Sequence, residues 1–301
     1  MRAAIIINPV AGGRARGLAV ADRVTLARRA LVRAGASGEV LLTERRGHAR
    51  ELAAEAVRSG CEVVAAWGGD GTLNEVGGAV AGTDAALAIV RGGSGNGMAR
   101  ELGIPADPRA ALDTALLGSV RQVDAGRFQG RTYLNVAGIG FDAWMASCFD
   151  SLGGERRGLA RYTIQTFRRG FTYPATTYLV NLDGEVLEVS AVILAIANFR
   201  QYGGNVFIAP SARPDDGELD VVAIGPRGAL RRLWLVPRIY GGTLDRAPGV
   251  VVRRARRIVV TAPEPAPSHV DGETMPLATR LEAEILPGVL HVRVPKGFTC
   301  G

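Results

Sequence analysis

The chain has 301 residues, of which 47% are hydrophobic, and a formal net charge of +7. A chain of this length and composition can bury a sizeable core and is expected to form two domains. Its longest apolar runs, such as residues 191–197, are too short to cross a bilayer, and residues 3–7 are too short for the core of a signal peptide. Its three cysteines are scattered, which excludes a disulfide framework and a zinc spacing. These features predict a cytoplasmic protein whose positive charge suits an acidic partner: a nucleotide, an anionic lipid surface or a nucleic acid.

Up to residue 121, short apolar runs alternate with helical patterns. The expected strands are residues 3–7, 40–42, 61–67 and 85–90, and the expected helices are 18–32, 48–58 and one after each of the last two strands. This alternation predicts βαβ units and a parallel sheet. In such a sheet, ligands bind beyond the carboxyl ends of the strands.

From residue 122 the pattern becomes that of a largely antiparallel domain. Asp183-Gly184, between two alternating runs, predicts a β-hairpin over residues 178–189. Helices are expected near 156–169 and 228–240, the proline-rich residues 263–267 are expected to form a stiff loop, and further strands are expected at 191–198, 218–224, 250–260, 280–286 and 289–294. The sequence therefore predicts two domains, 1–121 and 122–301, with the last residues free to pack back on the first domain.

In the stretch CEVVAAWGGDGTLNEV, three glycines (Gly68, Gly69 and Gly71) surround the carboxylate of Asp70, between an expected strand and an expected helix. Glycine costs folding entropy, so the cluster needs a structural reason or a ligand. Small residues at a helix N-terminus let a polyphosphate approach the backbone, and the Thr72 hydroxyl adds a donor. Asp70 would repel bare phosphate and is expected to meet Mg²⁺ or a substrate hydroxyl. A tight turn with an aspartate cap is the alternative, and the spacing favours the phosphate site.

Two further loops of small residues follow the first and the fourth expected strand, NPVAGG and RGGSGNG. Their expected nucleotide contacts are Asn8, Pro9, Gly12, Gly13, Gly93, Ser94, Gly95 and Asn96. Thr43 closes the second strand, and Asn74 and Glu75 lie on the first turn of the helix after Asp70; for these three, capping and ligand contact are equally good interpretations. The spacings exclude a P-loop, the dinucleotide-binding fingerprint and the nucleophile elbow of a hydrolase.

The loops NPVAGG, GGDGTLNEV and GGSGNGMARELG resemble, in order and spacing, the three signature loops of the diacylglycerol kinase and sphingosine kinase catalytic superfamily. The similarity runs through nearly the whole chain and is strongest to the bacterial soluble lipid kinases. It implies a phosphofructokinase-like parallel α/β domain followed by an antiparallel β-sandwich domain, with ATP and lipid meeting in the cleft between them. Asn96-Gly97 departs from the Asn-Asp pair of many diacylglycerol kinases and is closer to sphingosine and ceramide kinases. The implied substrate is therefore a diacylglycerol, a ceramide or a sphingoid base, with diacylglycerol itself in question.

The same resemblance reaches into the second half of the chain. The stretch SARPDDGELD resembles the family's Asp-Asp-Gly loop, which holds a structural Mg²⁺. By correspondence the ligands are the Asp216 carboxylate and the backbone carbonyls of Arg213 and Glu218, and Asp124 links this site to the active centre. An ordinary acidic turn is the alternative for the loop, and an exposed strand residue is the alternative for Asp124.

Two other motifs acquire roles from the resemblance. GIGFD is similar to the sequence that lines the lipid pocket, which makes Asp142 a candidate for binding the lipid headgroup. In HVDGE, the pair Asp271-Gly272 indicates a hairpin turn by itself. The resemblance makes Glu273 the candidate catalytic base, with Asp70 as the alternative.

The predicted function is ATP-dependent phosphorylation of a lipid hydroxyl, in which the glycine loops hold the phosphates and Mg²⁺ bridges them near Asp70. Within enzymes the alternative is an NAD kinase, which shares the Gly-Gly-Asp-Gly loop; the Gly-Ser-Gly-Asn-Gly loop and the Asp-Asp-Gly motif argue against it. From another class, a non-catalytic sensor of nucleotide or lipid is the alternative, and the full set of acidic residues argues against it.

A membrane surface is the other expected partner, because a lipid kinase must collect its substrate from a bilayer. Arginine and apolar residues alternate in 156–171, and Leu233, Trp234 and Ile239 form a second apolar set. Such segments suit an anionic interface, although helices packed on the sandwich are equally compatible with them. The arginines of residues 253–257 are expected on the solvated side of a strand, so nucleic acid is not an expected partner. The protein is thus expected to be cytoplasmic and peripherally membrane-associated, and a homodimer is compatible with the sequence.

Overall fold

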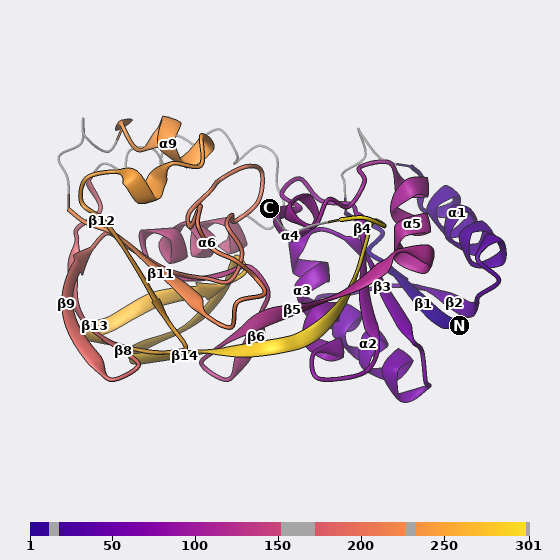
Figure 1. Cartoon of the computed structure of the whole chain (residues 1–301), viewed down its shortest axis with the longest axis horizontal. Helices are drawn as coiled ribbons and strands as arrows, with labels where there is room; N and C mark the ends of the chain where they lie inside the picture. Colours follow the sequence, from indigo (N-terminus) through magenta and orange to yellow (C-terminus); the bar gives the residue numbers. More distant parts are fainter. Residues whose placement is uncertain (12–17, 152–171, 227–232, 299–301) are drawn as a thin grey trace. The chain divides into compact units, whose positions relative to one another are not determined.

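The computed structural model describes residues 1–11, 18–151, 172–226 and 233–298 (Figure 1). Two compact units have the bounds Met1–Ala125 with Pro287–Gly301, and Gly126–Leu286. The chain leaves the first unit within β5 (Ser119–Phe128) and returns to it within β14 (Glu273–Val294). The first unit therefore consists of two separate stretches of the chain, and the second unit is the continuous stretch between them.

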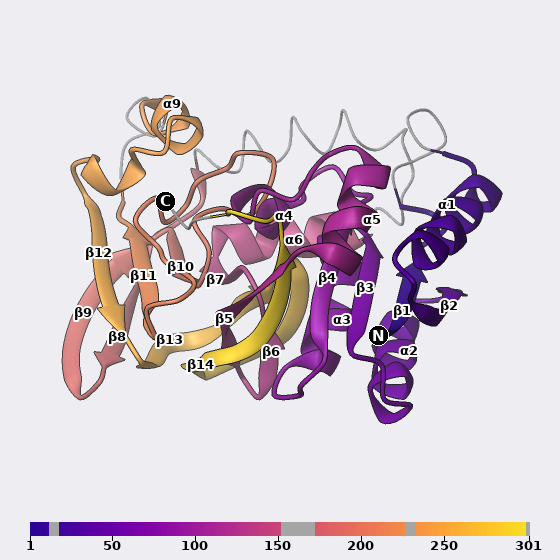
Figure 2. The same ribbon diagram turned by 45° about the vertical axis from the view of Figure 1, so that its right-hand side comes forward.

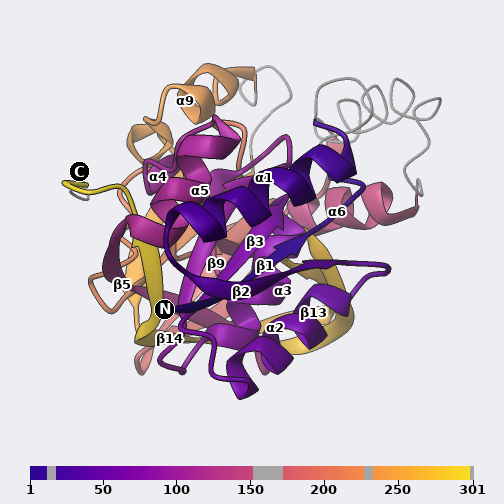
Figure 3. The ribbon, with the colours of Figure 1, turned by 90° about the vertical axis from the view of Figure 1, so that its right-hand side faces the viewer.

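The first unit is a parallel sheet with helices on both faces. The strands run in the order β4-β3-β1-β2, and the end of β14 pairs in parallel with β4. Helices α1 and α5 cover one face of this sheet, and α2 and α3 cover the other (Figure 3). The elements are β1 (Arg2–Ile7), α1 (Val20–Arg33), β2 (Ser37–Leu42), α2 (His48–Arg58), β3 (Val63–Gly68), α3 (Asp70–Val80), β4 (Ala86–Arg91), α4 (Gly97–Glu101) and α5 (Pro108–Leu117).

Burial explains this architecture and confirms the predicted parallel sheet. Every residue of β3 is buried, as are five of the six in β1 and five of the six in β4. Strands that are covered on both faces consist of nearly continuous apolar runs, which is the pattern of these segments. The carboxyl ends of β1, β3 and β4 carry the three glycine-bearing loops.

The second unit is an antiparallel β-sandwich. Its strands run in the order β12-β11-β10-β7-β13-β14, with β8 and β9 added beside β13, and β5 and β6 beside β14 (Figure 2). The elements are β6 (Arg131–Tyr133), β7 (Val136–Gly140), α6 (Phe141–Ser151), β8 (Thr176–Leu182), β9 (Glu185–Ala191), β10 (Ile193–Ala197), β11 (Leu219–Ile224), α9 (Val236–Tyr240), a 3₁₀ turn η2 (Leu244–Arg246), β12 (Val250–Ala255) and β13 (Arg257–Val270).

Alternate residues of β7, β10 and β11 point into two different hydrophobic clusters. Leu194 and Val221 belong to the larger cluster, together with residues of β8 and β13. Their neighbours Ala195 and Val222 belong to the second cluster, which Leu235 and Leu244 cover. Because side chains alternate along a strand, the two clusters lie on opposite faces of these strands. The prediction of a sandwich domain is therefore confirmed.

The predicted hairpin is confirmed, with Asp183 (φ 51°) and Gly184 (φ 104°) both in the left-handed region. Such φ values are what a two-residue hairpin turn requires. The predicted strand at 250–260 is instead two strands, β12 and β13. The two strands are separated by Arg256. There the Asp183 carboxylate accepts the backbone N–H groups of Arg256 and Arg257 at 2.9 and 2.8 Å.

The prediction of a loop at residues 263–267 is wrong, because this stretch lies inside β13. β13 pairs with β8 through Ile258–Thr261 and with β7 through Ser268–Val270. The prolines lie between these two pairings, where the register to β14 also shifts. A residue without an N–H group is tolerated at such an irregular position. The segments 280–286 and 289–294, predicted as two strands, are one strand, β14.

The expected helix at 156–169 lies outside the described residues. Of the expected helix at 228–240, residues from 233 onward are described, and α9 occupies the last part. Within the described ranges, no helix is both long enough and apolar enough to cross a membrane.

Candidate active site

The glycines at the ends of β3 and β4 are required by close packing of two loops. The backbone N–H of Gly92 donates to the Gly68 carbonyl at 2.8 Å. A Cβ atom on Gly93 would lie 2.6 Å from the Cα atom of Gly69, and one on Gly68 would lie 2.5 Å from the Thr72 side chain. No side chain fits at such distances from its neighbours. The glycine cluster therefore has a structural reason, which holds whether or not a ligand binds there.

Asp70 ties these two loops together. Its carboxylate accepts the backbone N–H groups of Asn96 at 2.8 Å and Gly97 at 3.0 Å, at the start of α4. Asn96 adopts a left-handed conformation (φ 50°), and its Oδ1 atom accepts the N–H of Gly93 at 3.1 Å. A carboxylate can accept about four hydrogen bonds, so Asp70 keeps capacity for a further donor or a cation.

The first loop is joined to the second through Asn8. Its Nδ2 group donates to Thr72 Oγ1 at 2.9 Å. The buried guanidinium of Arg23 in α1 donates to the carbonyls of Asn8 at 3.3 Å, Ala11 at 2.9 Å and Leu18 at 3.0 Å. Arg23 thus holds both flanks of the NPVAGG loop, a role that the sequence reasoning missed. A lone arginine in an amphipathic helix gives no signal of this kind.

Among the other predicted nucleotide contacts, Gly12 and Gly13 lie outside the described residues. Glu75 is buried, and its two carboxylate oxygens accept the N–H groups of Gly47 at 2.9 Å and Ala49 at 3.0 Å, at the start of α2. This geometry favours the capping interpretation of Glu75 over ligand contact. Thr43 and Asn74 are likewise buried.

Several loop residues keep exposed surface at the carboxyl end of the sheet. They are Asn8, Pro9, Gly69, Asp70, Gly71, Gly93, Ser94 and Gly95. With few side-chain atoms in the way, their backbone groups are accessible to a polyphosphate. The first unit therefore brings together most of the residues predicted to bind a nucleotide.

In the second unit, Glu273 begins β14 and forms an ion pair with Arg131 of β6. Their side chains are 21% and 25% exposed. The preceding Asp271 accepts the N–H groups of Leu134 at 2.7 Å and of Asn135 and Val136 at 2.9 Å each. Asp271 therefore fixes the turn, and Arg131 orients the carboxylate of Glu273. The sequence reasoning missed Arg131.

Asp142, the predicted headgroup residue, is buried at the start of α6. Its Oδ2 atom accepts the Tyr202 hydroxyl at 2.6 Å and lies 3.3 Å from His269 Nε2, and its Oδ1 atom accepts the N–H of Ala143 at 2.9 Å. The N–H of Gly272 donates to His269 Nδ1 at 3.2 Å, which leaves the ring hydrogen on Nε2, facing Asp142. Burial and the neighbouring carboxylate hold the pKa of Tyr202 well above its usual value. Asp142 thus has a full set of partners within the unit, and headgroup contact stays a prediction.

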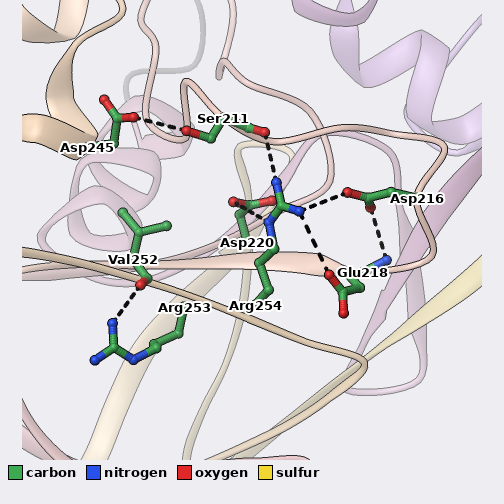
Figure 4. Close-up of polar contacts among 8 residues, drawn as sticks. All are labelled: Ser211, Asp216, Glu218, Asp220, Asp245, Val252, Arg253 and Arg254. Carbon is green, nitrogen blue, oxygen red and sulfur yellow. Dashed lines mark hydrogen bonds and ion pairs between the residues drawn. The ribbon is translucent and has the colours of Figure 1, made fainter.

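The acidic loop before β11 is closed by an arginine. Asp216, Glu218 and Asp220 all face the guanidinium of Arg254 (Figure 4). Burial raises the pKa of Asp220 to about 6. Within the described part of the chain, no three His, Cys, Asp or Glu residues are arranged to hold a metal ion. Because the Arg254 guanidinium faces the Asp216 carboxylate that was predicted to bind Mg²⁺, the loop does not fit a metal as it stands.

Two other residues were predicted for the metal site, Arg213 through its backbone carbonyl and Asp124 through a linked network. Arg213 is exposed. Asp124 is buried in the first unit, where its Oδ1 atom accepts the N–H of Gly288 at 2.6 Å. Its interpretation as an exposed strand residue is therefore wrong, and its link to a metal stays a prediction.

Comparison with known proteins agrees with this arrangement. Residues 2–128 match the diacylglycerol kinase catalytic domain, and residues 135–294 match the YegS C-terminal NAD kinase beta sandwich-like domain. The fold is similar to that of a diacylglycerol kinase from Bacillus anthracis, with a TM-score of 0.75 and 22% identity over 97% of this chain and 96% of that one.

Two curated relatives are similar over most of their length. A protein of Mycobacterium tuberculosis (strain H37Rv) named "Diacylglycerol kinase" is 33% identical over 82% of this chain and 82% of its own. A protein of Pseudomonas aeruginosa named "Probable lipid kinase YegS-like" is 34% identical over 88% of this chain and 87% of its own. The chain therefore belongs to the diacylglycerol kinase family of lipid kinases, with a catalytic domain of that family followed by a YegS-type C-terminal domain.

Proposed function

We propose that this lipid kinase transfers the γ-phosphoryl group of ATP to a hydroxyl group of a lipid. The observation that carries the proposal is the set of small, partly exposed residues on three loops at the carboxyl ends of β1, β3 and β4. Ligands of open α/β sheets bind at this edge. The names of the relatives support a lipid as the acceptor.

In this proposal, the first unit binds the nucleotide. The partly exposed backbone groups at the start of α3 and at Ser94 and Gly95 bind the phosphates, and Asn8 and Thr72 hold the loops in position. The Asp70 carboxylate, which has acceptor capacity left after its two hydrogen bonds, would hold the Mg²⁺ that accompanies ATP. That ion would neutralise charge on the transferred phosphoryl group.

Glu273 is the proposed base for the lipid hydroxyl. An alcohol is too weak an acid to lose its proton before reaction, so the first task of the carboxylate is to hold the oxygen in line with the phosphorus. The ion pair with Arg131 fixes the carboxylate in one orientation, which suits this task. Asp70 is the alternative base.

The acceptor is tested with radiolabelled ATP and a panel of lipids in mixed micelles: diacylglycerol, ceramide, a sphingoid base and, as a soluble competitor, NAD. We expect label in a lipid, with diacylglycerol as the first candidate because of the relative's name. Label in NAD alone would identify an NAD kinase and overturn the proposal. Absence of label from every acceptor, with ATP still bound, would support the non-catalytic sensor instead.

We also propose that the region around α9 touches the bilayer during lipid collection. Leu233, Trp234, Val236 and Tyr240 are between 41% and 71% exposed, whereas Leu235 is buried in the second cluster. Exposed apolar and aromatic residues of this kind insert into a lipid interface. The arginines expected to help them, within 156–171, lie outside the described residues.

Sedimentation with liposomes tests this contact. We expect Trp234→Ser to reduce binding, and we expect binding to fall at high salt only if basic residues also contribute. Equal sedimentation of the wild type and Trp234→Ser would contradict the proposed contact. Binding that depends neither on the salt concentration nor on anionic lipid would contradict only the contribution of basic residues.

A further inference from the structure

Arg254 lies directly opposite Asp220 in the antiparallel pair of β11 and β12. Side chains of such cross-strand partners share one face of the sheet. Asp220 is 1% exposed, and the side chain of Arg254 is 39% exposed. The guanidinium therefore reaches from the surface over a buried carboxylate.

The nitrogen atoms of this guanidinium all face oxygen atoms (Figure 4). Nε lies 3.6 Å from Asp220 Oδ1. Nη1 lies 3.3 Å from Asp216 Oδ2 and 3.9 Å from Glu218 Oε2. Nη2 donates to the backbone carbonyl of Ser211 at 3.2 Å. Three carboxylates and one carbonyl thus surround the guanidinium, and oxygens of these two kinds are what a hard divalent cation binds.

Two of these oxygens depend on the arginine. Asp216 Oδ2 and Asp220 Oδ1 are buried, and neither has a hydrogen-bond partner among the described residues. Their ion pairs with Arg254 are therefore the compensation for removing these charges from water. A second cation at the same Asp216 oxygen would be repelled by the guanidinium.

We infer that Arg254 is the resident cation of the Asp216–Asp220 loop and takes the place of the metal ion that the family resemblance implies there. The second unit then needs no Mg²⁺ for its stability. If the proposed function is correct, the Mg²⁺ dependence of turnover reflects only the ion that accompanies the nucleotide, not an ion bound to the second unit. The first of these statements can be tested without any kinase activity.

The test compares thermal unfolding of the full chain in EDTA and in millimolar Mg²⁺, for the wild type, Arg254→Met and Arg253→Met. Arg253 is the matched control, because it is the neighbouring arginine on β12 and is also exposed. Among the described residues, the one hydrogen bond of its guanidinium is from Nη1 to the adjacent Val252 carbonyl, at 2.9 Å. We expect the wild type to unfold at the same temperature in both conditions. Arg254→Met should unfold roughly 5–10 °C lower, since it leaves buried carboxylates uncompensated, and Mg²⁺ should recover part of the loss. Arg253→Met should behave like the wild type.

Either of two results would overturn the inference. One is a wild-type unfolding temperature that drops in EDTA and rises again with Mg²⁺ in a saturable way. The other is an Arg254→Met protein as stable as Arg253→Met in EDTA. Should Arg254→Met fail to fold, calorimetric titration of the nucleotide-free wild type with Mn²⁺ shows whether the loop binds a divalent cation. Lack of binding supports the inference, and stoichiometric binding that Asp216→Asn abolishes refutes it.

Discussion

Replacing Asp70 by asparagine probes the contact that joins the second and third glycine loops. The carboxylate accepts two backbone N–H groups, from Asn96 and Gly97. An asparagine side chain has one acceptor oxygen, so one N–H would face an NH₂ group and both bonds would lose their ionic component. Hydrogen bonds to charged groups contribute about 1.5–3 kcal/mol each. We therefore expect a loss of about 2–3 kcal/mol, which corresponds to a decrease of about 5–10 °C in Tm.

The assay is thermal unfolding followed by circular dichroism, with Asp84→Asn as the control because Asp84 is an exposed acid of the same unit. Turnover of Asp70→Asn is measured in parallel over a range of Mg²⁺ concentrations. We expect Asp70→Asn to lose both stability and turnover. If Asp70→Asn has the same Tm as Asp84→Asn but no turnover, the hydrogen bonds to Asn96 and Gly97 do not stabilise the protein. The structural role assigned to the carboxylate is then refuted.

Four other substitutions separate catalysis from structure. Glu273→Gln should lower kcat by about 10²–10⁴-fold with nearly unchanged ATP affinity, and Arg131→Met should lower kcat as well. If Glu273→Gln keeps full turnover while Asp70→Asn is inactive at every Mg²⁺ level, Asp70 is the base. Glu75→Gln should cost about 1–3 kcal/mol of stability without raising the KM for ATP, and a raised KM at unchanged stability would restore the ligand interpretation. Gly93→Ala should destabilise the protein, because its Cβ would lie 2.6 Å from a backbone atom, and a Tm equal to that of the wild type would contradict the close packing of the two loops.

Much of the first unit could be predicted from the sequence, because β1, β3 and β4 are nearly continuous apolar runs and each of these runs is followed by a helical pattern. The extents of the strands in the second unit could not. Strand β14 continues past Pro287 and through Gly288 (φ 58°), two residues that normally indicate a turn. Its continuity depends on partners from both units, which no local pattern encodes.

The candidate site was predictable as a set of loops but not as a set of contacts. The glycine pairs at residues 68–69 and 92–93 end adjacent strands, so their mutual packing could have been read from the sequence. By contrast, Glu75 caps a helix that begins 27 residues before it. Local spacing contains no information about such a partner. The residues that the sequence predicted to contact a ligand therefore fall into two groups. Some, such as Glu75, hold the local structure in place, and others, such as Ser94, are accessible on the loops.

The arginines at 253 and 254 show how strand register decides the role of a charge. By composition they are equivalent members of a basic run, and both were expected in solvent. The pairing of Leu219 with Ala255 places Asp220 opposite Arg254 and Val221 opposite Arg253. A shift of one residue would place Arg253 opposite the buried carboxylate and turn Arg254 away. The number of arginines in the chain therefore overstates the positive charge available to an acidic partner, because at least one of them, Arg254, has its charge balanced by the carboxylates around it.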